Sequence, residues 1–236
     1  MALRTRIILC AHGTTSHSGR SAITTLVNAV RREAVDHEVV DAFVDVQQPL
    51  VTEVLGETSG RRVIVPLMLA HDTATDQVLR AASAGDDLVR VAPSLGPDWV
   101  LAEIGVRRLI EAGARPADTI VMVAPEADSA MALADIAKGA RLLSAVWGGR
   151  VHVGVMAGEG TPVAEALDVA RAYKRRVVVS QYALTSSESS AAIGRLGADV
   201  VTAPLLGSGA PDPRLVTLVM SRATSRGSWV NGVGSR

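Results

Sequence analysis

The sequence is poor in the residues that support cross-linking, aromatic stacking and membrane insertion. It has a single cysteine, Cys10, which excludes an internal disulfide and is typical of a protein from a reducing cytoplasm. Aromatic residues make up only 3% of the chain, too few and too scattered for a base-stacking platform. Every apolar run is shorter than a membrane span, and the N-terminus lacks the apolar core of a signal peptide. We therefore expect a cytoplasmic protein.

The chain also lacks an excess of charge of either sign. Its 24 basic residues are balanced by 24 acidic residues, which argues against a nucleic acid or a membrane surface as partner. Hydrophobic residues make up 48% of the sequence, so a chain of this length can bury substantial cores. These features predict a globular protein of one large or two small domains.

A regular alternation of strand-like and helix-like patterns is what the sequence does contain. Strands are expected near residues 5–11, 38–45, 62–70, 88–92, 118–124, 151–157, 176–183 and 199–203. Helices are expected near residues 19–35, 50–58, 74–84, 98–113, 129–147, 162–173, 187–196 and 212–223. Strands that alternate with helices predict an α/β fold with parallel sheets and helices on both faces.

The second half of the sequence repeats the first at a nearly constant offset. The matching pairs are Arg61–Ala70 with Arg175–Leu184, Val91–Pro97 with Thr202–Ser208, Ala42–Leu55 with Val153–Leu167, and the strand ending at Ala11 with Thr119–Ala124. In the third pair, Pro49 and Pro162 each open a helix. A period this long indicates a domain duplication and excludes a solenoid repeat.

The turn Ala112–Pro116 carries the glycine and proline that commonly end a helix, and it is the expected domain boundary. We predict two similar domains, residues 1–115 and 116–225, each a parallel four-stranded sheet flanked by helices. Residues 226–236 have no periodicity and are expected to form a flexible tail.

Candidate site residues follow three strands of the first half. His12 comes directly after the buried strand Ile7–Ala11, and Asp45 and His71 follow the next two strands. The carboxyl ends of parallel strands are where open α/β sheets bind ligands, and neighbouring strands lie only about 4.8 Å apart. Two imidazoles and one carboxylate make a plausible site for a divalent transition metal with open positions. Their counterparts in the second half are Pro125, Gly158 and Thr185, so that half is predicted to be a scaffold that caps the site.

The loop after the first strand supplies further candidates for binding. Gly13, Thr14 and Thr15, with Ser16, offer backbone N–H groups that can form an anion-binding nest. Arg20 is a candidate for a charge-assisted contact with an acidic ligand, although a solvated helix residue is the simpler interpretation.

These residues resemble the sirohydrochlorin chelatase family, the class II tetrapyrrole chelatases, in its long two-domain form. The resembling segments, in the family's order, are Leu9–Thr14, Ala42–Pro49, Val63–Leu69, Ser94–Pro97, Arg176–Tyr182 and Gly197–Leu205. Together they span nearly the whole chain.

The resemblance implies an enzyme that inserts Fe²⁺ or Co²⁺ into sirohydrochlorin or a related tetrapyrrole, for siroheme or cobalamin biosynthesis. It implies His12 and Asp45 as catalytic residues, with His71 joining them as metal ligands and Gly13, Thr14 and Thr15 near the substrate. The divalent metal is then a substrate, and no organic cofactor is expected. Because both lobes belong to one chain, a monomer already provides the two-lobed cleft.

The third site departs from the family's pattern. The family ends its third strand with a leucine, a short glycine-containing turn, a histidine and, a few residues later, an aspartate. Here the segment Leu69–Asp76 has no glycine and is about two residues shorter. Aligning Asp76 with the family's aspartate puts Asp72 in the histidine's place, so either His71 or Asp72 fills the third ligand position.

Two other functions are compatible with parts of the sequence. A relative that binds a tetrapyrrole or a metal without catalysis would keep the fold and account for the irregular His71 segment. A histidine phosphatase also has a His-Gly pair after its first strand, but it needs an arginine directly before the histidine to grip phosphate. Ala11 occupies that position, which makes the phosphatase the weakest of the three.

Overall fold

The structure is a computed structural model that describes residues 5–186 and 192–225. The predicted tail, 226–236, and the first part of the helix predicted near 187–196 lie outside the described residues.

Two four-stranded parallel sheets form the framework, with the strand orders β2-β1-β3-β4 and β6-β5-β7-β8. The elements of the first half are β1 (Arg6–Ala11), α1 (His17–Glu33), β2 (Glu38–Phe43), α2 (Val51–Gly56), β3 (Arg62–Pro66), α3 (Thr73–Ser83), β4 (Val89–Val91) and α4 (Trp99–Glu111). Those of the second half are β5 (Thr119–Ala124), α5 (Ala130–Trp147), β6 (Val151–Val155), α6 (Val163–Arg171), β7 (Val177–Gln181), β8 (Val200–Val201) and α8 (Pro213–Thr224). The identical strand orders confirm the predicted fold, two parallel four-stranded sheets with flanking helices.

The backbone pairing corrects two details of the predicted alignment between the halves. The carbonyl of Arg61 accepts the N–H of Arg6, and in the second half it is Arg176, not Arg175, that accepts the N–H of Thr119. Likewise Pro162 occupies the N-cap position of α6, which corresponds to Leu50 before α2 and not to Pro49. The halves differ by single residues in their loops, and matching apolar patterns cannot detect a shift of one residue.

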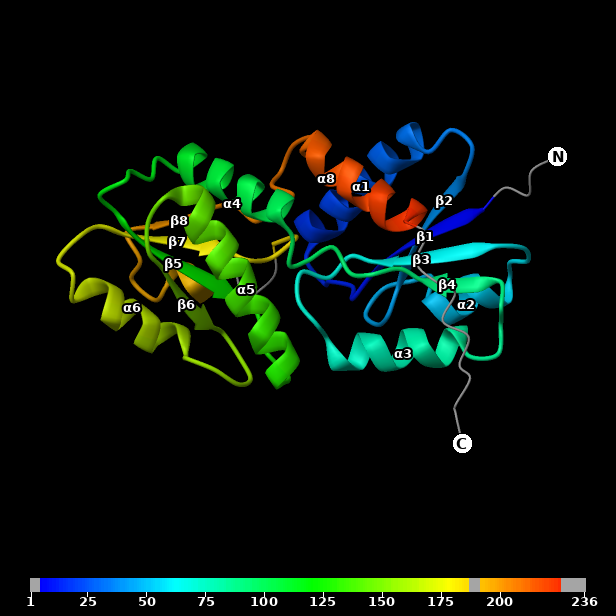
Figure 1. The fold of residues 1–236 in the computed structure, drawn as a ribbon, viewed down its shortest axis with the longest axis horizontal. Coiled ribbons are helices and arrows are strands. Elements are labelled where there is room, and N and C mark those ends of the chain that lie inside the picture. Colours follow the sequence, from blue (N-terminus) through cyan, green and yellow to red (C-terminus); the bar gives the residue numbers. More distant parts are fainter. Residues whose placement is uncertain (1–4, 187–191, 226–236) are drawn as a thin grey trace.

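The last helix of each sequence half packs on the other half's sheet. Helix α4 lies against α5 and β7, whereas α8 lies against α1 and β3. Figure 1 shows α4 in green over the second sheet and α8 in red over the first. We call β1–β4 with α1–α3 and α8 the first lobe, and β5–β8 with α4–α6 the second lobe. The boundary at residue 115, predicted from the duplication, therefore divides the sequence but not these packed lobes.

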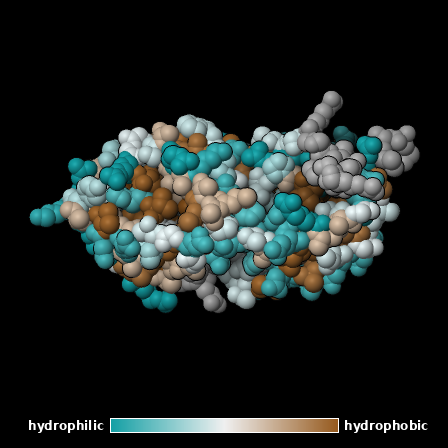
Figure 2. Space-filling view, turned by 60° about the horizontal axis from the view of Figure 1, so that its bottom comes forward, coloured by the Kyte–Doolittle hydropathy of each residue, from teal (hydrophilic) through white to brown (hydrophobic). Residues whose placement is uncertain are grey.

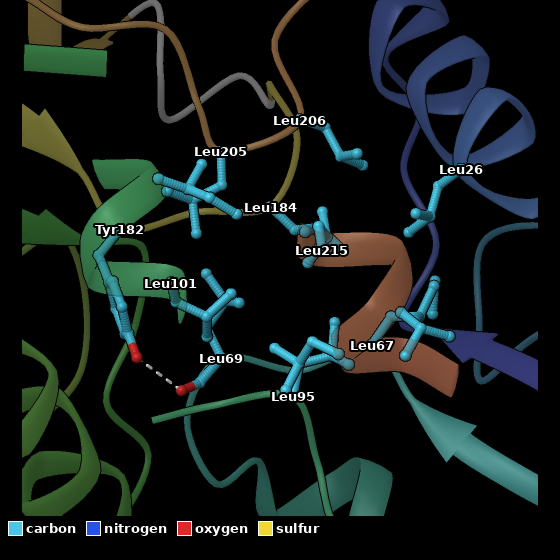
Figure 3. Close-up of a cluster of buried hydrophobic side chains, with 14 of the residues drawn as sticks. Leu26, Leu67, Leu69, Leu95, Leu101, Tyr182, Leu184, Leu205, Leu206 and Leu215 are labelled. Atoms are coloured by element: carbon cyan, nitrogen blue, oxygen red, sulfur yellow. Dashed lines mark hydrogen bonds between the residues drawn. The ribbon is translucent and has the colours of Figure 1, made fainter. Parts of the chain in front are cut away.

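Leucine side chains form one continuous core where the lobes meet. Leu26 of α1, Leu101 of α4, Leu184 after β7 and Leu215 of α8 all belong to it and are nearly or fully buried. Figure 3 shows these residues converging from both lobes, together with Leu67 and Leu69 from the end of β3. Burial of apolar surface on this scale stabilises the contact between the lobes.

Arginines secure the exchanged helices at their ends. From α8, Arg222 donates to the carbonyl of Ser94 at 3.0 Å and to the Asp98 carboxylate at 2.7 Å. In the second lobe, Arg108 of α4 donates to the carbonyl of Leu205 at 2.9 Å. Charge-assisted hydrogen bonds as well as the shared core therefore hold α4 and α8 against the lobes on which they pack.

The surface carries scattered hydrophobic residues. On the face drawn in Figure 2, hydrophobic groups alternate with hydrophilic ones. None of the helices within residues 5–186 and 192–225 is both long enough and apolar enough to cross a membrane.

Candidate functional site

A cleft of about 320 Å³ lies between the two lobes, where the carboxyl ends of β1, β3, β5 and β7 face one another. Its described lining is Ala11, His12, Gly13, Thr14, Ile23, Gln47, Leu67, Met68, Leu69, Ala70, His71, Asp72, Ala124, Pro125, Glu126, Ile136, Tyr182, Ala183, Leu184 and Thr185. Both lobes contribute the ends of their central strands, as expected for a ligand site in parallel α/β sheets. The walls are mostly apolar, with a few polar groups.

The loop after β1 brings His12 to this cleft through a close backbone contact. Gly13 has a φ of 107°, and a Cβ atom at this position would collide with the carbonyl oxygen of Asp45. The backbone N–H of Asp45 in turn donates to the carbonyl of His12 at 3.0 Å. Because glycine permits this contact, the chain turns sharply after β1 and leaves the His12 side chain exposed at the cleft.

Some of the backbone N–H groups predicted to form an anion-binding nest already donate hydrogen bonds to acceptors of the protein. The N–H of Thr14 donates to Gln47 Oε1 at 2.8 Å, and the N–H of Ser16 donates to Thr14 Oγ1 at 3.1 Å. Arg20 donates to the carbonyl of Thr15 at 2.8 Å, and both of these residues lie outside the cleft lining. Of this loop, only His12, Gly13 and Thr14 reach the cleft.

Asp45 does not line the cleft, although the sequence pattern places it there. Its side chain is exposed and accepts the N–H of Val46 at 2.7 Å, within a turn where Val46 has a φ of 65°. This turn places Gln47, two residues further on, in the lining instead. Sequence reasoning missed Gln47 because the strand-end rule selects a position along the chain and does not determine how the following turn is built.

His71 and Asp72 both line the cleft, so the two alternatives for the third position lie side by side. The carboxylate of Asp72 is the N-cap of α3 and accepts the N–H of Thr75 at 2.6 Å. Capping of this kind satisfies an otherwise unpaired N–H at the start of the helix. The His71 imidazole is therefore the better candidate for contact with a ligand.

Two carboxylates of the second lobe hold the backbone of the His71 segment. Asp135 of α5 accepts the N–H of His71 at 2.9 Å, and Asp128 accepts the N–H of Thr73 at 2.7 Å. Burial opposes ionisation of Asp128, but hydrogen bonds from Thr73 and Ser129 and the nearby His71 together lower its pKa. Asp128 is thus held as an anion at the start of α3, where the helix dipole favours negative charge.

Tyr182 is a second-lobe residue that sequence reasoning did not single out as part of the site. It is buried at the end of β7, and its hydroxyl donates to the carbonyl of Leu69 at 2.9 Å (Figure 3). Its ring packs against Gly139 of α5, where a Cβ atom would leave too little space. Burial raises the pKa of Tyr182, which keeps the hydroxyl protonated as a donor. Its position directly after an apolar strand is the signal that could have identified it as a site residue.

The charged groups of the cleft set limits on its chemistry. The ionisable side chains in the described lining are His12, His71, Asp72, Glu126 and Tyr182, and this lining contains no lysine or arginine. Within the described parts of the chain, no group of three or more His, Cys, Asp or Glu side chains is arranged to hold a metal ion. Of the predicted set, His12 and His71 belong to the described lining and Asp45 does not.

Comparison with known proteins supports the resemblance seen in the sequence. Residues 6–112 match the model of the CbiX family, in agreement with the resemblance predicted from the sequence. No curated protein sequence matches the chain.

Three solved structures share the fold over nearly the whole length of this chain. SirB from Bacillus subtilis, solved with Fe³⁺, has a TM-score of 0.72 at 13% identity, with 93% of this chain and 94% of that chain covered. The sirohydrochlorin chelatase SirB from Bacillus subtilis subspecies spizizenii, in complex with cobalt, has a TM-score of 0.74 at 14% identity, with 94% of each chain covered. DR2241 from Deinococcus radiodurans, a multi-domain protein with structural similarity to chelatases, has a TM-score of 0.71 at 17% identity; the match covers 94% of this chain and 55% of that one. At these identities the likeness establishes the fold.

Proposed function

We propose that the protein inserts a divalent metal ion into sirohydrochlorin or a related tetrapyrrole, and the match of residues 6–112 to the CbiX family model supports this proposal. The observation that carries the proposal is the interlobe cleft, in which two histidines from strand ends of the first lobe are set among apolar walls. The fold it shares with SirB, whose structures hold Fe³⁺ and cobalt, supports the same function.

The chemistry of insertion matches the groups at the cleft. Two pyrrole protons must leave the macrocycle while the metal sheds water, and a neutral imidazole accepts a proton near pH 7. His12 is exposed at the cleft and is our candidate for this base. The apolar side chains of Leu67, Met68 and Leu184 offer a surface for the flat face of a macrocycle.

The metal is a substrate in this scheme. Imidazole nitrogen suits both Fe²⁺ and Co²⁺. We propose that His12 and His71 receive the ion, since the described lining has no third aligned ligand, and that His12 accepts a pyrrole proton once the tetrapyrrole nitrogens have replaced it on the metal. Asp45 stays in the proposal as a carboxylate next to the cleft, outside the described lining. Siroheme or cobalamin biosynthesis in the cytoplasm, by a monomer, is the setting that we propose for this activity.

A non-catalytic relative is the second candidate function. It is favoured by the lack, among the described residues, of a three-residue group arranged to hold a metal ion. Such a protein would hold a tetrapyrrole or a metal without joining the two. A histidine phosphatase gains no support, because Ala11 precedes His12 and the described lining has no arginine to bind phosphate.

Absorption spectroscopy with sirohydrochlorin and Fe²⁺ or Co²⁺ separates these functions. We expect the protein to accelerate the spectral change that marks insertion. His12→Ala should slow insertion by about a hundredfold or more, the usual scale for loss of a general base. His17→Ala is the matched control, because His17 is also exposed but lies outside the cleft lining. A tetrapyrrole spectrum shifted by binding, without insertion, would favour the non-catalytic relative. An insertion rate equal to that without protein, with no binding, would reject both.

A further inference from the structure

The segment that carries His71 is tied to the second lobe at every other residue. Tyr182 donates its hydroxyl to the carbonyl of Leu69, Asp135 accepts the N–H of His71, and Asp128 accepts the N–H of Thr73. The three contacts have lengths of 2.9, 2.9 and 2.7 Å. They come from the end of β7, from α5 and from the loop before α5. The same stretch of backbone is thus held along its length by the lobe that contributes neither His12 nor His71.

Two of these partners are carboxylates, and both lie outside the cleft lining. A carboxylate that accepts a backbone N–H makes a stronger bond than a neutral acceptor, because the charge assists it. The N-terminus of α3 also receives one acceptor from each lobe, Asp72 from the first and Asp128 from the second. The start of α3 and the residue before it are consequently fixed relative to both sheets.

Position matters here because reactivity depends closely on the placement of a catalytic group. A displacement of about 1 Å costs roughly a hundredfold in rate where a side chain must meet a reacting atom. His71 is the one imidazole of the cleft whose segment departs from the family's pattern, so its register depends on what holds the segment.

We infer that Asp135 and Asp128 are positioning residues, through which the second lobe sets the place of His71 in the cleft. The inference rests on the proposed function for its catalytic consequence, but the tethering itself is independent of any activity. The second lobe then does more than cap the site, because it holds the backbone on both sides of His71.

Two measurements test this role. One is amide hydrogen exchange monitored by NMR, and the other is the kinetics of metal insertion. Asp135→Ala should speed exchange at the His71 amide by about tenfold or more, because loss of the acceptor exposes that N–H to local opening. Asp128→Ala should do the same at the Thr73 amide. Asp135→Asn should restore slow exchange at His71, since the amide oxygen still accepts a hydrogen bond. Asp168→Ala, an exposed aspartate of α6 far from these contacts, is the matched control.

The kinetics of metal insertion test whether positioning of His71 matters for catalysis. In Asp135→Ala, we expect kcat for metal insertion to fall about tenfold, with KM for the tetrapyrrole changed less than twofold and kcat recovered in Asp135→Asn. Unchanged exchange at both amides in the alanine variants would overturn the inference. Faster exchange with wild-type kcat would also overturn it, because His71 would then need no positioning. A wild-type protein that inserts no metal would refute the proposed function instead, and the exchange data would still decide whether the second lobe holds the segment.

Discussion

Replacing Tyr182 with phenylalanine removes a single hydroxyl from the contact between the lobes. The hydroxyl is buried, with the residue only 8% exposed, and it donates to the carbonyl of Leu69 at 2.9 Å. Its loss leaves that carbonyl buried without this partner, which costs about 1–3 kcal/mol of unfolding free energy. For a chain of this length each kcal/mol corresponds to about 2–4 °C in Tm.

Tyr173→Phe is the matched control, because Tyr173 is the only other tyrosine of the sequence. It is 47% exposed, and its hydroxyl accepts a hydrogen bond from Arg150 at the surface. We expect this variant to lie within about 0.5 kcal/mol of the wild type. Urea denaturation of all three proteins measures the difference. Equal stabilities for Tyr182→Phe and the wild type would refute the conclusion that this hydrogen bond joins the lobes.

The pH dependence of the Tyr182 effect follows from its raised pKa. The unfolded chain ionises its tyrosines near pH 10, whereas burial keeps the folded hydroxyl protonated beyond that. The folded state therefore holds more protons above about pH 10, and stability falls there as the pH rises. Between about pH 6 and 9 the difference between Tyr182→Phe and the wild type should stay constant.

The remaining predictions concern α8 and the loop after β1. The hydrogen bonds from Arg214 hold the pKa of Asp212 at about 2, below the usual value near 4, so its contribution to stability is present above about pH 4 and lost as the pH falls toward 2. In urea titrations at acid pH, Asp212→Asn should consequently lose less stability over this range than the wild type, and parallel curves would contradict the assignment. Gly13→Ala should destabilise the protein by about 1–3 kcal/mol more than Gly60→Ala. Both glycines have a positive φ, but only at Gly13 would the added Cβ meet backbone atoms, and equal losses would show that the contact with Asp45 does not constrain the loop.

Local patterns in the sequence were sufficient to predict the strands and helices and their duplication. Apolar runs such as Ile7–Ala11 became buried parallel strands, and the helix expected near residues 19–35 is α1, which buries Ile23, Leu26 and Val30. The exchange of α4 and α8 between the lobes could not be predicted in this way. An amphipathic helix such as α4 shows which face is buried, but not which of two similar sheets buries it.

Site residues that directly follow strand ends could be predicted from the sequence. Site residues whose position depends on the conformation of a turn could not. His12 and His71 reached the cleft because each follows a central strand closely. Asp45 did not, because the turn at Val46 directs it to solvent and brings in Gln47. Asp135 gave no signal at all, since it is one polar residue on a helix and gains its role only from the packing of one lobe on the other.

The position of a metal ion in the cleft is the most direct test of the claim that the first-lobe histidines receive the metal. Anomalous scattering from crystals grown with Co²⁺ measures it. We expect cobalt between the lobes, with an imidazole nitrogen of His12 or His71 at about 2.0–2.2 Å and at least one open or water-filled position. Cobalt bound only at the second-lobe strand ends, near Glu126 and Thr185, or only outside the cleft, would contradict the claim.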